Sequence, residues 1–228
     1  LQTMNMQNRT EVVEIFGPDG IDEFIAANLK ILNFGLSFPV IITPIQNDEI
    51  VNEDEYTVLA CNAEHGIPAF SYRYQEKARI GKFFPEKAKA LGIPEGKAWN
   101  ELQNGNSVEI NGKKILPADV TGEKRVGKNI GISGDTRPTE SLTKFFENCD
   151  YLSFDCTFSD DMKERARETN HSTAKEAAEL ANNAKVGKLI LTHFSARYKD
   201  ESVLLDEAKK IHESTIAAND LMEIEIQR

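Results

Sequence analysis

The sequence has few cysteines and no long apolar run. Its cysteines are Cys61, Cys149 and Cys156, an odd number without a Cys-x-x-Cys pair, which argues against a disulfide framework and against a cysteine-built zinc site. The longest apolar runs, at 38–42 and 188–191, are far shorter than the roughly 20 residues that cross a bilayer. We therefore predict a soluble protein of the reducing cytoplasm, without a membrane partner.

An overall excess of basic charge is also missing. The chain has 27 lysine and arginine residues against 37 aspartate and glutamate residues, a net charge of −10, which disfavours broad binding to nucleic acid and predicts no DNA partner. One segment departs from this balance, because seven basic residues oppose three acidic ones between Arg73 and Lys97. This local excess suits contact with a polyanion at one place. The alternative is an ordinary solvated surface.

Strand-like and helix-like patterns alternate along the chain. Residues 11–16, 21–32 and 40–45 predict a strand, a helix and a buried strand, and strands predicted at 56–62 and 69–75 are expected to form a sheet with them. Later strands are predicted at 128–132, 151–158, 188–191 and 221–226. Later helices are predicted at 139–148, at 173–184 with Thr173 and Glu176 as a capping box, and from Asp200 to about Ser214. This alternation is typical of an α/β protein.

The segment 77–112 has a different composition, rich in glycine, proline, lysine and asparagine. Residues 91–97 lack core periodicity, so we predict a mobile insertion that projects from the body. Asn111-Gly112 predicts a two-residue hairpin turn in which both residues have positive φ. Trp99 either stacks on RNA or anchors the insertion to the body, and anchoring is favoured because lone aromatic residues usually pack.

Polar residues that can bind a metal lie next to predicted strands and helices. His65, His171 and His193 each flank a regular element, and Asp135 follows a strand. Imidazoles and a carboxylate form a familiar ligand set for zinc, but each of these residues alone is more often structural. Spacing therefore leaves both interpretations open. The fourth histidine, His212, is assigned to a solvated face of the last helix.

Four strings of residues, in this order, closely resemble those of ribonuclease Z, the tRNA 3′-processing endoribonuclease of the metallo-β-lactamase superfamily. The strings are AEHGIPAFSYR at 63–73, SGDTRP at 133–138, NHSTA at 170–174 and THFSARY at 192–198. The resemblance covers nearly the whole chain. It implies the α/β fold of that superfamily, an αββα sandwich, interrupted by a flexible arm. The implied division is 1–75 for the first half, 76–112 for the arm and 113–228 for the second half.

The resemblance also implies roles for the residues of these strings. His65, Asp135 and His193 match zinc ligands, and the aspartate is expected to bridge two zinc ions. His171, paired with Asp155, is expected to help protonate the leaving group. Asp155 stands where the family usually has glutamate, and a shorter carboxylate changes the reach to an imidazole. An ordinary carboxylate at the end of a strand is the alternative for this residue.

The expected partners follow from the same resemblance. Precursor tRNA is the expected substrate, clamped by the arm, and the protein is expected to form a homodimer that presents tRNA from one subunit to the other. The candidate RNA-binding residues are Lys87, Lys89, Lys97 and Arg197.

The superfamily's signature His-x-His-x-Asp-His does not occur in the sequence. Residues 1–4 resemble the stretch that usually follows it, so we expect the first third of the usual chain to be missing and the fold to be incomplete at its N-terminus. We expect this chain alone to be inactive or impaired. Two alternatives stay open: a noncatalytic tRNA-binding or scaffold subunit, and another phosphodiesterase of the superfamily.

Overall fold

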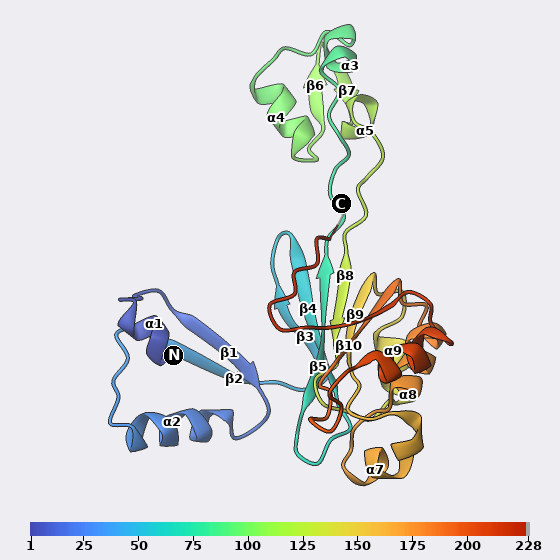
Figure 1. Cartoon of the computed structure of the whole chain (residues 1–228). Coiled ribbons are helices and arrows are strands. Elements are labelled where there is room, and N and C mark those ends of the chain that lie inside the picture. Colours follow the sequence, from blue (N-terminus) through green and yellow to red (C-terminus); the bar gives the residue numbers. More distant parts are fainter. Residues whose placement is uncertain (227–228) are drawn as a thin grey trace. The chain divides into compact units, whose positions relative to one another are not determined.

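The computed structural model describes residues 1–226, apart from the side chains of Asp48 and Glu49. The chain divides into two compact units (Figure 1). The first consists of Leu1–Gln75 and the residues from Asn129 onward, and the second is Glu76–Lys128. The second unit is longer than the segment 76–112 outlined from the sequence. No helix in the described residues combines the length and apolar character needed to cross a membrane.

A mixed sheet of seven strands forms the centre of the first unit in the described part of the chain, with the order β11-β10-β9-β8-β5-β4-β3. Strands β8 to β11 are parallel, whereas β5 pairs antiparallel with β8 and β3 antiparallel with β4. The strands are β3 Asp48–Asn52, β4 Tyr56–Asn62, β5 Phe70–Glu76, β8 Asn129–Ile132, β9 Tyr151–Asp155, β10 Lys188–Thr192 and β11 Thr215–Ala217. This mixed sheet confirms the predicted α/β class.

Side chains along the parallel strands are alternately buried and partly exposed, and the buried ones pack one face of the sheet against helices. Leu152 and Phe154 of β9, and Leu189 and Leu191 of β10, are fully buried in one hydrophobic cluster. Helix α8, Ala174–Asn183, contributes a row of small buried side chains to this cluster, which lets the helix approach closely. Its predicted capping box is present. The other helices of this half are α6 Glu140–Phe145, α7 Lys163–Glu168 and α9 Ser202–Lys209, with a 3₁₀ turn η1 at Asp160–Met162.

Parallel strands need crossover connections, so their carboxyl ends meet at one edge of the sheet. Helix α6 lies between β8 and β9 along the chain, α7 and α8 lie between β9 and β10, and α9 lies between β10 and β11. The loops that leave β8, β9 and β10 therefore start side by side. These loops carry the polar residues considered below.

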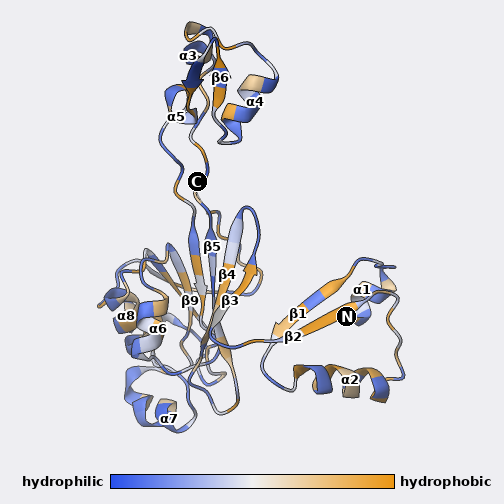
Figure 2. Ribbon diagram, turned by 180° about the vertical axis from the view of Figure 1, so that it is seen from behind, coloured by the Kyte–Doolittle hydropathy of each residue, from blue (hydrophilic) through white to orange (hydrophobic). Residues whose placement is uncertain are grey.

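The N-terminal residues form the predicted strand, helix and strand. Strands β1, Val13–Gly17, and β2, Val40–Pro44, pair in parallel, and α2, Ile21–Ile31, connects them; α1 covers Gln2–Met6. The expectations that the second strand is buried and joins the central sheet are wrong: the described β2 pairs with β1 alone, and Ile41 is 50% exposed. Hydrophobic residues concentrate on β1 and β2 and recur along α2 (Figure 2). An apolar sequence predicts that a strand has a face that prefers burial, but it does not identify which strand pairs with it.

The second unit has its own small core, although residues 91–97 lack core periodicity in the sequence. Its elements are α3 Pro85–Ala90, α4 Lys97–Gln103, β6 Val108–Ile110, β7 Lys113–Ile115 and α5 Pro117–Val120. Its buried residues are Ala88, Ile93, Leu102, Ile115 and Val120. They are scattered between glycines and prolines, so they produce no regular pattern. The predicted hairpin is confirmed, because Asn111 and Gly112 have φ of 54° and 74°.

The C-terminal part differs from the expectation in several details. The predicted strand at 221–226 is wrong, since these residues are irregular and β11 pairs with β10 instead. Helix α9 ends at Lys209 rather than near Ser214, and its N-cap is Glu201, while Asp200 accepts hydrogen bonds from Ser202. His212 therefore follows the helix and is half-buried rather than on a solvated helical face.

Candidate metal centre

Five residues chosen from the sequence lie together at the edge where the parallel strands end. Asp135 follows β8, Asp155 is the last residue of β9, and His193 directly follows β10. His65 lies in the turn between β4 and β5, and His171 lies shortly before α8. Five positions far apart in the sequence thus meet at one sheet edge.

The loop of His65 is fastened to the loop of Asp135 by backbone contacts. Glu64 donates its N–H to Thr136 Oγ1 at 2.9 Å, and the Arg137 N–H donates to the Glu64 carbonyl oxygen at 2.9 Å. These bonds bring the first string of the sequence beside the second. The side chains are then close enough that ligand atoms of His65, Asp135 and His171 lie within 4.8 Å of one another, as do those of Asp155, His171 and His193.

The imidazole rings form a compact row. The ring centroids of His65 and His171 are 5.1 Å apart, and those of His171 and His193 are 5.0 Å apart with nearly parallel planes. His193 Nε2 lies 3.4 Å from Asp135 Oδ2. His171 thus contacts both neighbours, and it belongs to the same group of potential ligands as His65 and Asp135.

Each of the three imidazoles has its Nδ1 atom engaged by the protein. His65 Nδ1 lies 3.1 Å from the Asn170 carbonyl oxygen, and His171 Nδ1 lies 2.7 Å from Asp155 Oδ2. His193 Nδ1 lies 2.8 Å from Thr157 Oγ1. Because a carbonyl or carboxylate oxygen only accepts hydrogen bonds, the network assigns the proton of the neutral ring to Nδ1. This leaves Nε2 unprotonated, with a lone pair that can bind a metal ion.

Asp155 is the hub of this network. Its side chain is fully buried, and it accepts hydrogen bonds from the Thr136 N–H at 3.1 Å, the Thr157 N–H at 2.9 Å, the Thr157 hydroxyl at 2.7 Å and His171 Nδ1. A buried carboxylate needs such donors to offset its lost hydration. Asp155 therefore does more than end a strand, since it fixes the orientation of His171.

Thr157 is a site residue that the sequence analysis missed. Its hydroxyl donates to Asp155 Oδ1 and therefore accepts from His193 Nδ1, joining two side chains whose closest contact, Asp155 Oδ1 to His193 Nδ1, is 4.0 Å. The available signal was the spacing Asp-x-Thr, because an aspartate readily accepts hydrogen bonds from the residue two positions later. That spacing is common and would not have been decisive alone.

Arg137 and Glu176 form a second missed pair beneath the site. Arg137 makes a two-pronged contact with the Glu176 carboxylate, with one distance of 2.7 Å, and also donates to the His171 carbonyl oxygen. Burial alone would raise the pKa of Glu176, but hydrogen bonds from Arg137 and the Thr173 N–H, together with the charges of Arg137 and Lys163, lower the pKa below its usual value. The pair holds the loop of His171 against the start of α8.

The candidate RNA-binding residues are distributed over both units. Lys87 lies over the Phe84 ring and Lys89 pairs with Glu95 at 3.0 Å, both in the second unit. Lys97 is the first residue of α4. In the first unit, Arg197 stacks on the Phe158 ring at 4.9 Å.

Trp99 packs within the core of the second unit, whereas the sequence favoured its anchoring the insertion to the body. Its ring lies 5.3 Å from that of Phe83, and its indole N–H donates to the Ile93 carbonyl oxygen at 3.1 Å. It is thus held by the second unit's own residues.

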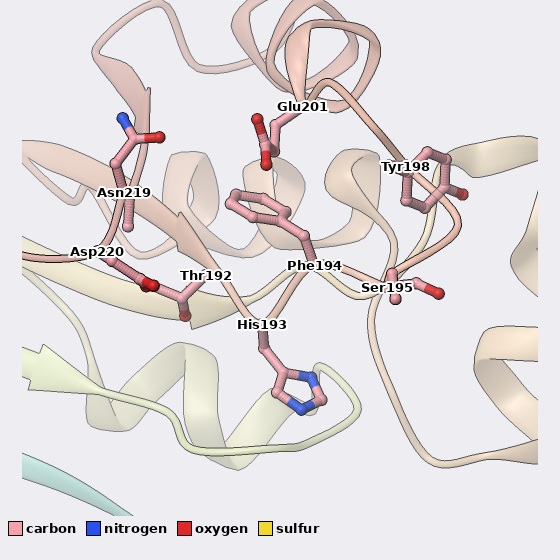
Figure 3. Close-up of a pocket in the computed structure, with 10 residues that line it drawn as sticks. Thr192, His193, Phe194, Ser195, Tyr198, Glu201, Asn219 and Asp220 are labelled. Carbon is pink, nitrogen blue, oxygen red and sulfur yellow. The ribbon is translucent and has the colours of Figure 1, made fainter.

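A cavity of about 630 Å³ borders His193. His193 and Phe194 follow one another at the end of β10, and their side chains point to opposite sides of the chain (Figure 3). His193 has a φ of 62°, a conformation uncommon for a residue with a side chain. This backbone conformation accompanies the separation of the two rings.

The donor set fits a divalent transition metal. The free imidazole nitrogens and the Asp135 carboxylate are the nitrogen and oxygen ligands that zinc accepts, and every imidazole is oriented by a second hydrogen bond, as metal-binding histidines usually are. On this structure two groups of side chains could hold such an ion, one made of His65, Asp135 and His171 and one of Asp155, His171 and His193, so that His171 belongs to both.

Comparison with known proteins places this arrangement in a family. No family model matches the chain. The ribonuclease Z of Nitrosopumilus maritimus is 60% identical over 227 residues, covering 100% of this chain and 76% of that protein, and the ribonuclease Z of Methanosarcina acetivorans is 41% identical, covering 99% and 74%.

Solved structures share the fold. The short form of human tRNase Z matches with a TM-score of 0.66 and 21% identity over 99% of this chain and 71% of that chain. The metallo-β-lactamase fold protein YhfI of Bacillus subtilis matches with a TM-score of 0.57 and 17% identity over 91% and 62%. The fold is therefore that of the metallo-β-lactamase proteins, and, by its identity to full-length relatives, the chain belongs to the ribonuclease Z family.

Proposed function

We propose that this protein, in its complete form, is a zinc-dependent endoribonuclease that removes the 3′ trailer of precursor tRNA, whereas this chain alone is inactive or impaired. The relatives bear the name ribonuclease Z, and a metal cofactor fits the fold neighbours and the His and Asp groups of the site. The observation that carries the proposal is the convergence of three imidazoles, each with Nδ1 engaged, beside Asp135.

In this proposal the residues divide the chemical work. His65, Asp135 and His193 would hold the zinc ions. When bound, these ions supply positive charge that activates water and stabilises the charge developing on the phosphate. His171 acts with a proton on each ring nitrogen: Asp155 accepts the Nδ1–H at 2.7 Å, and the Nε2 proton passes to the departing oxygen, which leaves the neutral ring. The hydrogen bonds of Asp155 keep that imidazole in one orientation.

The second unit supports an RNA substrate through its charge. It carries eleven lysine and arginine residues against seven aspartate and glutamate residues, a net +4, while the rest of the chain carries −14. In the proposal Lys87, Lys89 and Lys97 contact the phosphate backbone, and Arg197 does so beside the catalytic residues. Each lost phosphate contact reduces the salt dependence of binding by about one unit of slope.

The decisive experiment compares two histidine variants. Made in the complete form of the protein, His193→Ala is expected to lose bound zinc and precursor tRNA cleavage while it keeps most of its tRNA affinity. His212→Ala is the matched control, because His212 lies outside the cluster. Zinc content is measured by atomic emission after dialysis, cleavage by gel, and tRNA affinity by filter binding at low salt.

Other outcomes contradict the proposal in distinct ways. Unchanged cleavage in His193→Ala would remove that residue from the catalytic site. Hydrolysis of a chromogenic phosphodiester with precursor tRNA left intact would indicate a different phosphodiesterase. Tight tRNA binding without bound zinc would indicate a noncatalytic subunit. Sedimentation equilibrium checks the homodimer, and cell fractionation checks the cytoplasmic location, both of which remain predictions.

A further inference from the structure

We infer that the cavity beside His193 binds one unpaired nucleobase next to the scissile phosphate and prefers a base with an exocyclic amino group. This inference deepens the proposed function and rests on it, since it assumes that an RNA strand passes the metal centre. The cavity has a volume of about 630 Å³, within the usual range for small-ligand sites. It lies at the carboxyl ends of β10 and β11, and one of its lining residues is His193.

The charge of the lining excludes a phosphate group as the natural occupant. Glu201 and Asp220 contribute carboxylates, and Asn219 contributes an amide, whereas the lining contains no lysine or arginine. A phosphate placed there would face two like charges without a compensating cation. The chemistry instead suits an uncharged group that offers N–H donors.

An aromatic ring supplies the surface on which such a group can stack. Phe194 is half-buried and packs against the main hydrophobic cluster, so its ring is already held before any ligand arrives. In Figure 3 the Glu201 side chain extends from the start of α9 towards this ring, and Asn219 and Asp220 lie on the opposite side from Tyr198. A flat heteroaromatic group beside the ring therefore meets oxygen acceptors at its edge.

These two features together select a nucleobase. Bases stack on aromatic side chains in proteins that bind single strands, and carboxylates accept hydrogen bonds from exocyclic amino groups. Guanine, adenine and cytosine carry such a group. Uracil presents a single N–H flanked by two carbonyl oxygens, which carboxylates repel. The expected order is therefore an amino-bearing base over uracil.

The position of the cavity relates it to the site of cleavage. Phe194 lines the cavity and His193 belongs to the candidate metal centre, yet the two residues are consecutive. A nucleotide whose phosphate reaches His193 is thus one side chain away from the cavity. Because this face is acidic, it favours insertion of the base and orients the backbone towards the metal centre.

The test uses precursor tRNA with 2-aminopurine at the nucleotide on either side of the cleavage point. This fluorescent base has an exocyclic amine and loses emission when it stacks. We expect binding to quench one of the two positions, and Phe194→Leu to restore most of its emission with less than a threefold change in total tRNA affinity. Thermal unfolding confirms that the variant is folded. Equal emission in free and bound RNA at both positions overturns the inference.

A second variant tests the edge contact independently of the packed ring. We expect Glu201→Gln to reduce the preference for an amino-bearing base over uracil at that nucleotide by about tenfold, the scale of a good base contact. Asp206→Asn is the matched control, because Asp206 lies exposed on the same helix and does not line the cavity. Unchanged selectivity in Glu201→Gln overturns the inference. Absence of any tRNA binding by the wild-type protein instead contradicts the proposed function itself.

Discussion

Replacing Thr157 by valine should weaken metal binding although Thr157 itself is not a candidate ligand. Valine has nearly the same shape as threonine, so the substitution removes the hydroxyl and little else. The hydroxyl lies 2.7 Å from Asp155 Oδ1 and 2.8 Å from His193 Nδ1, and the residue is only 7% exposed. Its loss leaves the His193 Nδ1–H without an acceptor, because the nearest Asp155 oxygen is 4.0 Å away.

The size of the effect follows from this geometry. A partly buried donor left without a partner costs about 1–3 kcal/mol, and loss of an outer hydrogen bond to a metal-binding histidine typically reduces affinity by roughly 10- to 100-fold. Asp155 keeps three other hydrogen bonds, so its own position should change little. We therefore expect zinc affinity to fall by about one order of magnitude, with the fold intact.

Competition with a chromogenic chelator measures the zinc affinity. Thr157→Ser should restore it, since serine keeps the hydroxyl. Thr215→Val is the control for loss of a buried threonine hydroxyl elsewhere, because Thr215 donates to the His212 carbonyl oxygen. Wild-type affinity in Thr157→Val, or an equal loss in Thr157→Ser, would refute the reasoning.

Four further predictions concern stability and reactivity. Arg137→Met should destabilise the protein by about 3–5 kcal/mol in urea unfolding because it leaves Glu176 buried without its partner, and a loss below about 1 kcal/mol would contradict this. The folded protein lowers the pKa of Glu176, so this carboxylate stabilises the fold above its unfolded pKa, and that stabilisation should be lost as the pH falls through the folded pKa. Urea unfolding measured from pH 7 to pH 3 should therefore show a smaller change of unfolding free energy with pH in Glu176→Gln than in the wild type. Leu102→Ala should cost about 2–5 kcal/mol of local stability in the second unit, seen as faster amide exchange there and not in the central sheet. Cys61 should be the first thiol to react with a disulfide reagent. Cys149 is buried, and desolvation raises its pKa to about 11, so it should react only on unfolding. Labelling of Cys149 before Cys61 in the folded protein would contradict the burial of Cys149.

Sequence patterns predicted the elements whose signals are local. The capping box of Thr173 and Glu176 placed the start of α8, and Asn111-Gly112 placed the hairpin turn, because both depend on residues only a few positions apart. Strand β4 was predicted with its observed bounds. Helix α7 was missed, since Lys163–Glu168 is almost entirely charged and offers no apolar periodicity.

Long-range features were harder to predict. The core of the second unit joins Ala88 to Val120 across several turns, and no single window of sequence contains that pattern. The grouping of His65 and Asp135 with His171 involves residues that could be chosen from residue chemistry and from the family's strings, but the hydroxyl of Thr157 could be assigned only from its contacts. Hydrogen bonds between distant loops depend on tertiary geometry, which spacing does not encode.

The strands on either side of the second unit would allow residues 76–128 to be exchanged for another segment. Gln75 on β5 lies directly opposite Asn129 on β8 in an antiparallel register. Two chain ends that face each other in this way can be joined by a tight hairpin turn. Shortened or chimeric enzymes could therefore be engineered by exchanging everything between these positions for a turn or for another binding module, which would keep the pairing of β5 with β8 from Tyr72 to Gln75.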